Sequence, residues 1–488
     1  MASVALVVDH PQRDLLGLVM VAYRLCAQGV TCHLVPARLA KLELAGLAPD
    51  VVLLNHVKRV DEPIVEMLAD IGARIAVLDT EGGVIESFET YERGLSTRHD
   101  LRRVVDCYCA WGPEFSARAE QRRWFERADL VVTGPPRFDF YRPPWRSVVP
   151  ELDAPDLDQG RSAVLLAGTF TLANSRFLSV EEECRILEEE AHQDRTFIEN
   201  RLQVEKRCLQ GMVELANELA QWAPEVQWLY RPHPFERRET YEAALDGGVT
   251  LRPHGSVQSW LLSVDALIQR GSTTAVEAAL AGATILSPDW LPEWLDIDAI
   301  HMVSIACADV DAVKQRLEPV VLGEARRDDR PLPSDAEQEI VRWFAAPDGN
   351  AHRRVADALV RLLPDGSSTV QKRRAAQWFA GVFPACNGLP VQLAGRLRLS
   401  LGIPRDFSFA RLRRRRGAIS WDEGGRAFSA AEVERILELI RRADPDEGKC
   451  DGTPVAVARA DDLAGYPLGY GLGRSLTVFP SRDGAAHA

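Results

Sequence analysis

The chain has 488 residues, more than one hydrophobic core usually serves, so two or three domains are expected. Its 46 % apolar and 26 % charged content is that of a soluble globular protein, and no stretch approaches the roughly 18 uninterrupted apolar residues of a membrane span. The net charge of −13 argues against a nucleic-acid partner. Asp9 comes too early for a signal peptide and the cysteines are scattered, so we expect a cytoplasmic protein without a disulfide framework or metal site.

Residues 1–150 are predicted to form a first Rossmann-like domain, because short β-rich segments alternate there with amphipathic ones. The first strand, Ser3–Val8, leads into a helix over Leu15–Gln28 that ends at Gly29. Further strands are expected at Thr31–Val35, Val51–Leu54, Arg74–Leu78, Asp106–Ala110 and Leu130–Val132. The proline-rich stretch Thr133–Trp145 cannot continue a sheet interior and marks the end of the domain.

Residues 151–366 repeat this alternation after a polar linker at Glu151–Arg161 and are predicted to form a second Rossmann-like domain that binds nucleotide. A long helical region covers about Glu182–Trp222. Strands are expected at Ala163–Ala167, Val226–Tyr230, Ala266–Gln269 and Thr284–Leu286, and helices at Ala275–Ala281, Asp335–Phe344 and His352–Leu363. The predicted fold class is therefore α/β, with two parallel-sheet domains that face a cleft.

Residues 367–488 form an extra region, mixed and partly helical, that begins with a concentration of positive charge. From Lys372 to Arg416 the sequence holds eleven basic residues and one acid, Asp406. Such a segment is suited to peripheral contact with anionic lipid at the inner face of the cytoplasmic membrane, or with an anionic polymer. A solvated helix face that packs on the acidic domains explains the same pattern, and both interpretations stay open.

Polar clusters follow the predicted strands at their carboxyl ends, where open parallel sheets bind their ligands. These clusters are His10–Asp14, Asn55–His56, Asp79–Gly83, Gly168–Asn174, Arg231–Glu236 and Arg270–Thr274. Because the carboxyl ends of parallel strands share one edge of a sheet, we expect the clusters to converge on the cleft.

The segment RGSTTAVEA combines a tight turn with a helix start, an arrangement suited to phosphate binding. Glycine lets the backbone come close, hydroxyls and free amides donate hydrogen bonds, arginine adds charge, and a glutamate one turn later is placed to accept hydrogen bonds from a ribose. The candidate nucleotide-binding residues here are Arg270, Gly271, Ser272, Thr273, Thr274 and Glu277. An ordinary helix capped by Ser or Thr is the alternative, and the spacing fits neither a Walker loop nor a dinucleotide motif.

The segment RPHPFE holds a histidine between two prolines, which keep the backbone extended and fix the direction of the imidazole. Arg231 and His233 are suited to a leaving phosphate, whose charge grows as a glycosidic bond breaks. Thr169, near the end of the first strand of the same domain, is a further candidate nucleotide-binding residue. A structural histidine in a proline-braced turn is the alternative.

Two motifs of the first domain supply candidate catalytic and acceptor-binding groups. In LDTEGG, Asp79 and Glu81 lie at a strand end before a glycine turn, where carboxylates can act as base or nucleophile. In VDHPQRDLLG, His10, Arg13 and Asp14 are candidates for contact with an acceptor sugar. Capping of backbone amides by the carboxylates is the alternative in both motifs.

The order of these motifs resembles that of CMP-sugar glycosyltransferases of GT-B architecture, which include bacterial sialyltransferases and Kdo transferases. Longer strings more closely resemble bacterial surface carbohydrate biosynthesis proteins of capsule and lipopolysaccharide clusters. These strings are VDHPQRDLLGL, LDTEGG, AWGPE, VTGPPRFD, RPHPFE, RGSTTAVEAAL and WFAAPDGNAHRRVADAL. The resemblance runs from about Val4 to Leu363 and does not clearly cover the residues beyond.

The resemblance implies roles for several residues. Glu81, the acid before glycine, would be the general base, with Asp79 as its rival if the reaction retains configuration. His233 would contact the CMP phosphate, and the hydroxyls at the later helix start would hold the same group. Thr80 separates the two acids, whereas the sialyltransferase pattern has adjacent acids, so the base and the stereochemical course stay open. Such enzymes typically need no catalytic metal, and no cofactor is expected beyond the nucleotide-sugar co-substrate.

We therefore hypothesise a cytoplasmic GT-B glycosyltransferase that moves an acidic sugar, Kdo-like or sialic-acid-like, from a CMP-sugar donor to a surface polysaccharide or glycolipid acceptor. One alternative keeps the fold and changes the donor to CDP-glycerol, as in glycerophosphotransferases, or to a UDP-sugar. Another is a non-catalytic, glycosyltransferase-like assembly subunit that binds glycan through the basic segment.

Overall fold

The computed structural model describes residues 2–37, 40–58, 61–80, 82–83, 88–95, 103–189, 193–252, 255–294, 297–324, 334–364, 428–445, 455–459 and 475–480. Within these ranges, no helix has the length and apolar character that crossing a membrane requires. The chain divides into two compact units. The first unit comprises Met1–Val148 together with Trp343–Ala488, and the second comprises Val149–Arg342.

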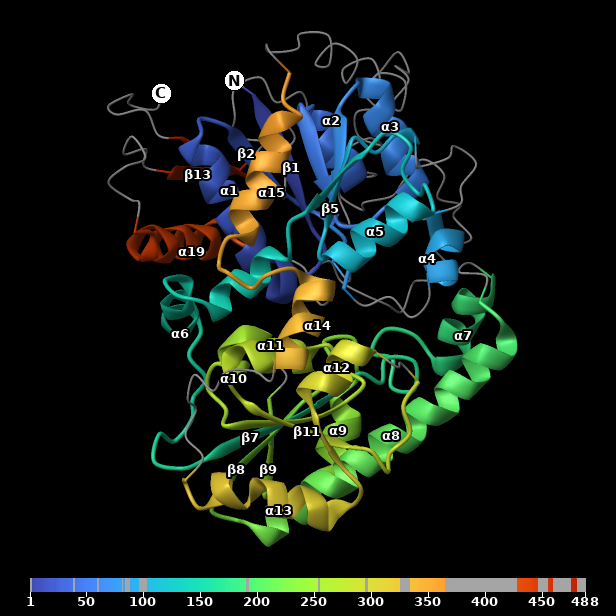
Figure 1. The fold of residues 1–488 in the computed structure, drawn as a ribbon, viewed down its shortest axis with the longest axis vertical. Coiled ribbons are helices and arrows are strands. Elements are labelled where there is room, and N and C mark those ends of the chain that lie inside the picture. Colours follow the sequence, from blue (N-terminus) through green and yellow to red (C-terminus); the bar gives the residue numbers. More distant parts are fainter. Residues whose placement is uncertain are drawn as a thin grey trace, which may run out of the picture. The chain divides into compact units, whose positions relative to one another are not determined.

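The first unit is built on a sheet in which the N-terminal strands all run parallel (Figure 1). These strands are β1 (Ser3–Val8), β2 (Thr31–Pro36), β3 (Val51–Leu54), β4 (Arg74–Val77), β5 (Cys107–Ala110) and β6 (Asp129–Val132). Their order in the sheet is β2-β1-β3-β4-β5-β6, so the chain turns back between β1 and β3. Such a reversal is the switch point at which open α/β sheets bind ligands.

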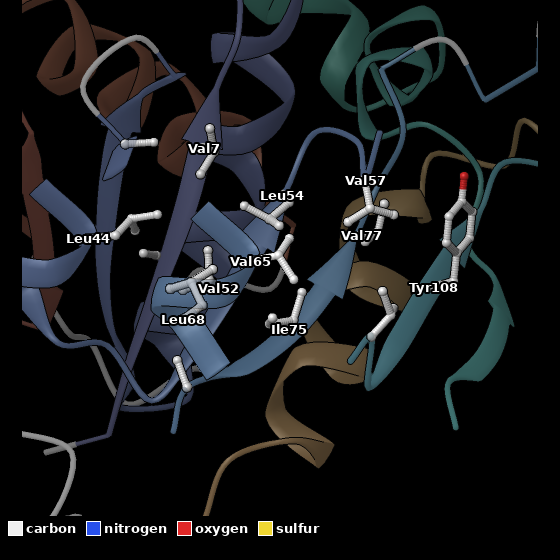
Figure 2. Packing of buried hydrophobic residues seen from close by; sticks show 14 of the residues in the cluster. Val7, Leu44, Val52, Leu54, Val57, Val65, Leu68, Ile75, Val77 and Tyr108 are labelled. Atoms are coloured by element: carbon white, nitrogen blue, oxygen red, sulfur yellow. The ribbon is translucent and has the colours of Figure 1, made fainter. Parts of the chain in front are cut away.

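Helices cover this sheet, and apolar side chains fill the space beneath them. The helices are α1 (Leu16–Ala27), α2 (Ala40–Leu47), α3 (Glu62–Ile71), α4 (Phe88–Leu95) and α5 (Pro113–Gln121), with a π-helical turn at Pro11–Leu15 before α1. Figure 2 shows part of the core, where Val52 and Ile75 of the sheet pack with Val65 and Leu68 of α3. All four side chains of β3 are buried, which explains its uninterrupted apolar sequence VVLL.

Segments from the C-terminal part of the chain complete the first unit. The strand β14 (Leu476–Pro480) pairs antiparallel with β2, and β13 (Val455–Arg459) pairs antiparallel with β14. The helices α15 (Ala351–Arg361) and α19 (Ala430–Ala443) both pack against α1. In this way β14 covers the edge of the sheet that β2 would otherwise present to solvent.

This division differs from the predicted one, which gave the second domain residues 151–366 and treated residues 367–488 as an extra region. The helix α15 belongs to the first unit, as do α19, β13 and β14. The physical reason is that their partners, α1 and β2, lie far upstream in the sequence. The basic segment Lys372–Arg416 lies outside the described residues.

The second unit holds a parallel sheet in the order β12-β11-β10-β7-β8-β9. The strands are β7 (Ala163–Gly168), β8 (Gln227–Arg231), β9 (Val249–Leu251), β10 (Ala266–Arg270), β11 (Thr284–Pro288) and β12 (Ile305–Cys307). The main helices are α7 (Val180–Glu189), α8 (Arg195–Trp222), α9 (Arg238–Ala244), α10 (Val257–Leu261), α11 (Thr274–Ala281), α12 (Asp298–Val303) and α13 (Val310–Val321). The short helix α6 (Val148–Leu152) and α14 (Ser334–Phe344) each span a boundary of the units in the sequence.

The chain turns back between β7 and β10 in this sheet, which gives the second unit its own switch point. The predicted α/β class with two Rossmann-like parallel sheets is confirmed. Two strands of the second unit, β9 and β12, were not predicted, because each is only three residues long and two of the three residues of β12 are exposed.

Candidate functional site

A pocket lies in the first unit at the switch point between β1 and β3. The pocket is open to solvent, and its non-atom space, open solvent included, is about 440 Å³. Polar and aromatic side chains from five separate segments line it: Arg13 and Asp14, Asn55, Asp79 and Thr80, Trp111, and Arg137. The strings VDHPQRDLLGL, LDTEGG, AWGPE and VTGPPRFD therefore meet at one place, although the sequence keeps them apart.

The first βα turn brings two of its three predicted acceptor-binding residues to the pocket. Arg13 and Asp14 line it, and they are paired with each other at 2.9 Å between Nε and Oδ1. Arg13 also reaches Asp9 at 2.7 Å, so two carboxylates balance its charge. His10 is buried, and its backbone N–H donates to Oδ2 of Asp14 at 3.0 Å. Asp14 thus caps the turn, as the alternative interpretation held, and also faces the pocket.

Asp79 is the buried acid of the pocket. Its side chain is 3 % exposed, and Tyr91 donates its hydroxyl hydrogen to Oδ2 at 3.2 Å. The Tyr91 hydroxyl lies 2.6 Å from that of Tyr108, and burial, followed by the charge of Asp79, raises the pKa of Tyr91 well above its ordinary value. The protonated hydroxyl of Tyr91 therefore contacts the carboxylate of Asp79, and the protonated hydroxyl of Tyr108 contacts that of Tyr91. Glu81, the other predicted acid, lies outside the described residues.

An aromatic wall forms the side of the pocket next to the glycine turn. The guanidinium of Arg137 lies 4.8 Å above the ring of Trp111, and its Nη1 donates to the backbone oxygen of Thr80 at 3.3 Å. On the glycine side, a Cβ at Gly82 would lie 3.1 Å from Cδ1 of Trp111, and a Cβ at Gly83 would lie 2.9 Å from Cε3. The backbone at both glycines therefore passes directly against the indole, and a side chain at Gly83 would overlap it.

The string WFAAPDGNAHRRVADAL also joins this unit, although the prediction placed it in the second domain. The buried carboxylate of Asp139 accepts hydrogen bonds from the backbone N–H of Ala351 at 3.0 Å and of His352 at 2.8 Å. The ring Nδ1 of His352 lies 2.7 Å from the same carboxylate. Phe344 stacks on Phe138 with the ring centroids 5.4 Å apart. These contacts fix the start of α15 beside the pocket segment 135–141.

One polar pair near the pocket was not among the predicted site residues. Nδ1 of His56 lies 2.6 Å from Oδ2 of Asp61, which also accepts the backbone N–H of Lys58 at 2.7 Å. In the sequence, His56 follows a predicted strand, but Asp61, five residues later, has the position of an ordinary helix N-cap and gives no sign of pairing with it. The pair becomes visible only in the structure of the segment between β3 and α3.

In the second unit, the predicted strand, turn and helix are present, and the turn before α11 lies at the switch point between β7 and β10. Gly271 has a φ of 63°, which favours glycine, and Ser272 donates its backbone N–H to Oε1 of Gln269 at 2.9 Å. The hydroxyls of Ser272 and Thr274 lie 3.0 Å apart. Thr273 is the N-cap residue and uses no side-chain oxygen for capping. The turn therefore places hydroxyls and helix-start amides together at the carboxyl end of β10.

Arg270 is held by acids of its own unit. Its guanidinium lies 2.9 Å from Asp289 and 3.0 Å from Glu293, and it also donates to the backbone oxygen of Leu291 at 2.9 Å. Two carboxylates thus balance the charge that was predicted to face a phosphate. Glu277, predicted to meet a ribose, is 4 % exposed. Arg270 is therefore paired and Glu277 is buried, and the backbone N–H groups of Ser272 and Ala275 already have acceptors, at Oε1 of Gln269 and at the backbone oxygen of Ser272.

The RPHPFE segment follows β8 at the same edge of the second sheet. Arg231 donates from Nη2 to the backbone oxygen of Gly255 at 2.7 Å, and burial lowers its pKa to about 10. His233 accepts the backbone N–H of Phe235 at Nδ1, 3.3 Å away, and its ring meets that of Phe235 edge to face. His233 is partly exposed, so its imidazole remains accessible.

Two buried glutamate side chains shape the loop that carries Thr169, the last predicted nucleotide-binding residue. Glu236 accepts the backbone N–H of Phe170 at 2.7 Å and contacts the hydroxyl of Tyr241, and burial raises its pKa to about 8. Glu205 of α8, fully buried, accepts the backbone N–H of Leu172 at 2.8 Å. Glu205 was not predicted, because one glutamate on a long charged helix gives no signal of burial. Thr169 itself is partly exposed beside β7.

No group of three or more His, Cys, Asp or Glu side chains able to hold a metal ion occurs among the described residues. The cysteines described by the structure, including Cys107 and Cys109, are free thiols.

No protein-family model and no curated protein matches the chain. Several solved structures share its general architecture. MnaA from S. aureus, determined with UDP, is 10 % identical, covers 75 % of this chain and 99 % of its own, and has a TM-score of 0.47. The UDP-GlcNAc 2-epimerase of Methanocaldococcus jannaschii is 11 % identical, covers 74 % and 100 %, and has a TM-score of 0.46. The wall teichoic acid polymerase TagF, soaked with CDPG, is 11 % identical, covers 74 % and 88 %, and has a TM-score of 0.45. At these values the likeness carries no argument about activity.

Proposed function

We propose that this chain is a glycosyltransferase that uses a nucleotide-activated sugar to build a bacterial surface glycan. The observation that carries the proposal is the meeting of four distant sequence strings at one pocket, where the carboxylate of Asp79 is buried at the switch point of the first sheet. A pocket of this kind holds a ligand beside an acidic group. The second unit contributes the glycine turn with its hydroxyls at its own switch point, which is suited to a phosphate.

In this proposal the second unit binds the nucleotide and the first unit binds the acceptor. An acceptor hydroxyl attacks the anomeric carbon of the donor, the bond from that carbon to the phosphate oxygen breaks, and the nucleotide leaves with the bonding electrons. The hydroxyl proton passes to a base of the first unit, for which the resemblance offers Glu81 and Asp79. Ser272, Thr274 and the partly exposed His233 stabilise the charge that grows on the leaving phosphate.

The donor is proposed to be a CMP-linked acidic sugar, with CDP-glycerol and UDP-sugars as the competing donors. Thermal unfolding of the chain with CMP, CDP or UDP separates them, because a ligand at about 100 times its dissociation constant stabilises the folded state by about 2.7 kcal/mol. The correct nucleotide raises the melting temperature most. A chain that none of the three stabilises would speak against the nucleotide site.

The decisive assay measures nucleotide release from each donor in the presence of surface glycan acceptors. Release that needs acceptor, falls strongly in Asp79→Asn or Glu81→Gln, and falls in His233→Ala supports the proposal. Glu218→Gln is the matched control, since Glu218 is exposed on α8 and pairs with Lys314 at 2.6 Å, away from the proposed groups. Wild-type rates in all three site variants would refute it.

Nucleotide binding without any turnover, combined with glycan binding, would instead identify a non-catalytic subunit. The test for that alternative is charge reversal within 413–416, which would abolish glycan binding and leave nucleotide binding intact.

A further inference from the structure

The loop after β3 holds a histidine–carboxylate pair for which the proposed function has no role. Nδ1 of His56 lies 2.6 Å from Oδ2 of Asp61, and the backbone N–H of Lys58 fixes the same oxygen at 2.7 Å. The backbone N–H of Asp61 in turn donates to the backbone oxygen of Lys58 at 2.8 Å. The carboxylate of Asp61 is therefore held by the backbone of its own loop as well as by the ring of His56.

This pair stands next to the pocket. His56 directly follows Asn55, which lines the pocket, and the backbone N–H of Thr80 donates to the backbone oxygen of Asn55 at 3.1 Å. The histidine loop and the segment that carries Asp79 therefore run side by side at the sheet edge. The His56 side chain is 24 % exposed, whereas Asp61 is 12 % exposed beneath it. Among the described residues, the other ring nitrogen, Nε2, has no hydrogen-bond partner.

The charges around His56 come from three elements. Burial lowers its pKa, but the hydrogen bond and charge of Asp61, at the start of α3, and the charge of Asp79, at the end of β4, outweigh burial and the opposing charge of Lys58, so the pKa lies above its ordinary value of 6.5. A ring that gains a proton here is stabilised by Asp61 at 2.6 Å, which is what a general base needs after the transfer.

We infer that His56 is the base of the proposed transfer, with Asp61 as its positioning residue, and this inference rests on the proposed function. The neutral ring keeps its proton on Nδ1, where Asp61 accepts it, and presents the lone pair of Nε2 to the acceptor hydroxyl. As the acceptor oxygen bonds to the anomeric carbon and the nucleotide leaves with its phosphate oxygen, the hydroxyl proton moves to Nε2. Asp61 then stabilises the cation, and Asp79 need not take the proton itself.

The test compares His56→Gln and Asp61→Asn with the wild-type chain, using the donor and acceptor that give turnover. A general base contributes about 10²–10⁴-fold to the rate, so His56→Gln is expected to lower kcat by about that factor, with KM for the donor unchanged. The wild-type pH profile is expected to rise through an apparent pKa above 6.5, and Asp61→Asn to move that rise to lower pH. Lys58→Arg is the matched control, because it changes an exposed side chain of the same loop and keeps both its positive charge and the backbone N–H that Asp61 accepts.

Each outcome decides the matter. An active His56→Gln variant with wild-type kcat overturns the inference and leaves the proposed function standing, as does a profile that rises near pH 4 through a carboxylate and does not respond to Asp61→Asn. A wild-type chain without turnover overturns the proposed function, and the inference with it. If His56→Gln does not fold, as judged by its melting temperature, the shift of the pH profile in Asp61→Asn decides the question.

Discussion

Protonation of His33 tests how the C-terminal strand is held on the first sheet. His33 lies in β2 with 6 % of its surface exposed, and its Nδ1 is 2.9 Å from Oγ1 of Thr477 in β14. Burial lowers the pKa of His33 from 6.5 to about 4. Between these values the unfolded chain binds a proton that the folded chain excludes, so the stabilising contribution of the neutral ring is fully present above pH 6.5 and is lost as the pH falls through about 4.

The size of this effect follows from the shift. At about 1.4 kcal/mol per pKa unit, the displacement from 6.5 to about 4 corresponds to about 3 kcal/mol of unfolding free energy. His33→Asn keeps a polar atom near Nδ1 but does not titrate in this range. Hydrogen exchange of the amides of β14, corrected for the intrinsic effect of pH, gives the opening free energy at neutral and at acid pH for both chains.

Carboxylates titrate in both chains over the same range, so the informative quantity is the difference between them. The wild-type chain is expected to lose about 3 kcal/mol more than His33→Asn between about pH 7 and about pH 4. An equal loss in the two chains would refute the reasoning, because the proton would then bind His33 without opening the strand pair.

Three further changes have defined outcomes. Glu236→Gln is expected to flatten the pH dependence of the melting temperature of the second unit. Burial raises the pKa of Glu236 to about 8, so the stabilisation by its protonated side chain is fully present below pH 4.5 and is lost as the pH rises through about 8. An unchanged dependence of the melting temperature on pH in the variant would contradict this. Gly83→Ala is expected to destabilise the first unit by about 1–3 kcal/mol in urea unfolding, because its Cβ would overlap the ring of Phe344. Gly247→Ala, in the second unit and with nothing within 4 Å of the added Cβ, is the control for adding a methyl group, and a loss in the first unit no larger than the loss that Gly247→Ala causes in the second would refute the overlap. Ser272→Ala is expected to weaken binding of the preferred nucleotide about tenfold by calorimetry, since a hydrogen bond to a charged group is worth about 1.5 kcal/mol or more, and an unchanged affinity would remove that hydroxyl from the site.

The parts of the fold that could be predicted are those with a local signal. Val4–Val8 and Val51–Leu54 are uninterrupted apolar runs, and the strands that contain them, Ser3–Val8 and Val51–Leu54, have the predicted bounds. The placement of α15 could not be predicted in this way. The contact that fixes α15 joins His352 to Asp139, which are 213 residues apart. Nothing in the sequence near either residue indicates that the other is its partner.

In the candidate site, too, the residues that could be predicted are those with a local signal in the sequence. The motif LDTEGG pointed to Asp79, which lines the pocket, because a strand end followed by glycines is a local pattern. The balance of charge at Arg270 was not visible, since Asp289 and Glu293 come from the segment after the next strand. The pairing of His56 with Asp61 could not be predicted for a different reason. It depends on the backbone conformation of a short loop, and such a loop has no periodic pattern in the sequence.

The most direct measurement of the central claim is a crystal structure of the chain with the nucleotide that stabilises it most. We expect the phosphate at the turn before α11, with oxygens within hydrogen-bond distance of the hydroxyls of Ser272 and Thr274, and His233 beside the leaving-group oxygen. A nucleotide bound elsewhere, or none at saturating concentration, would contradict the account.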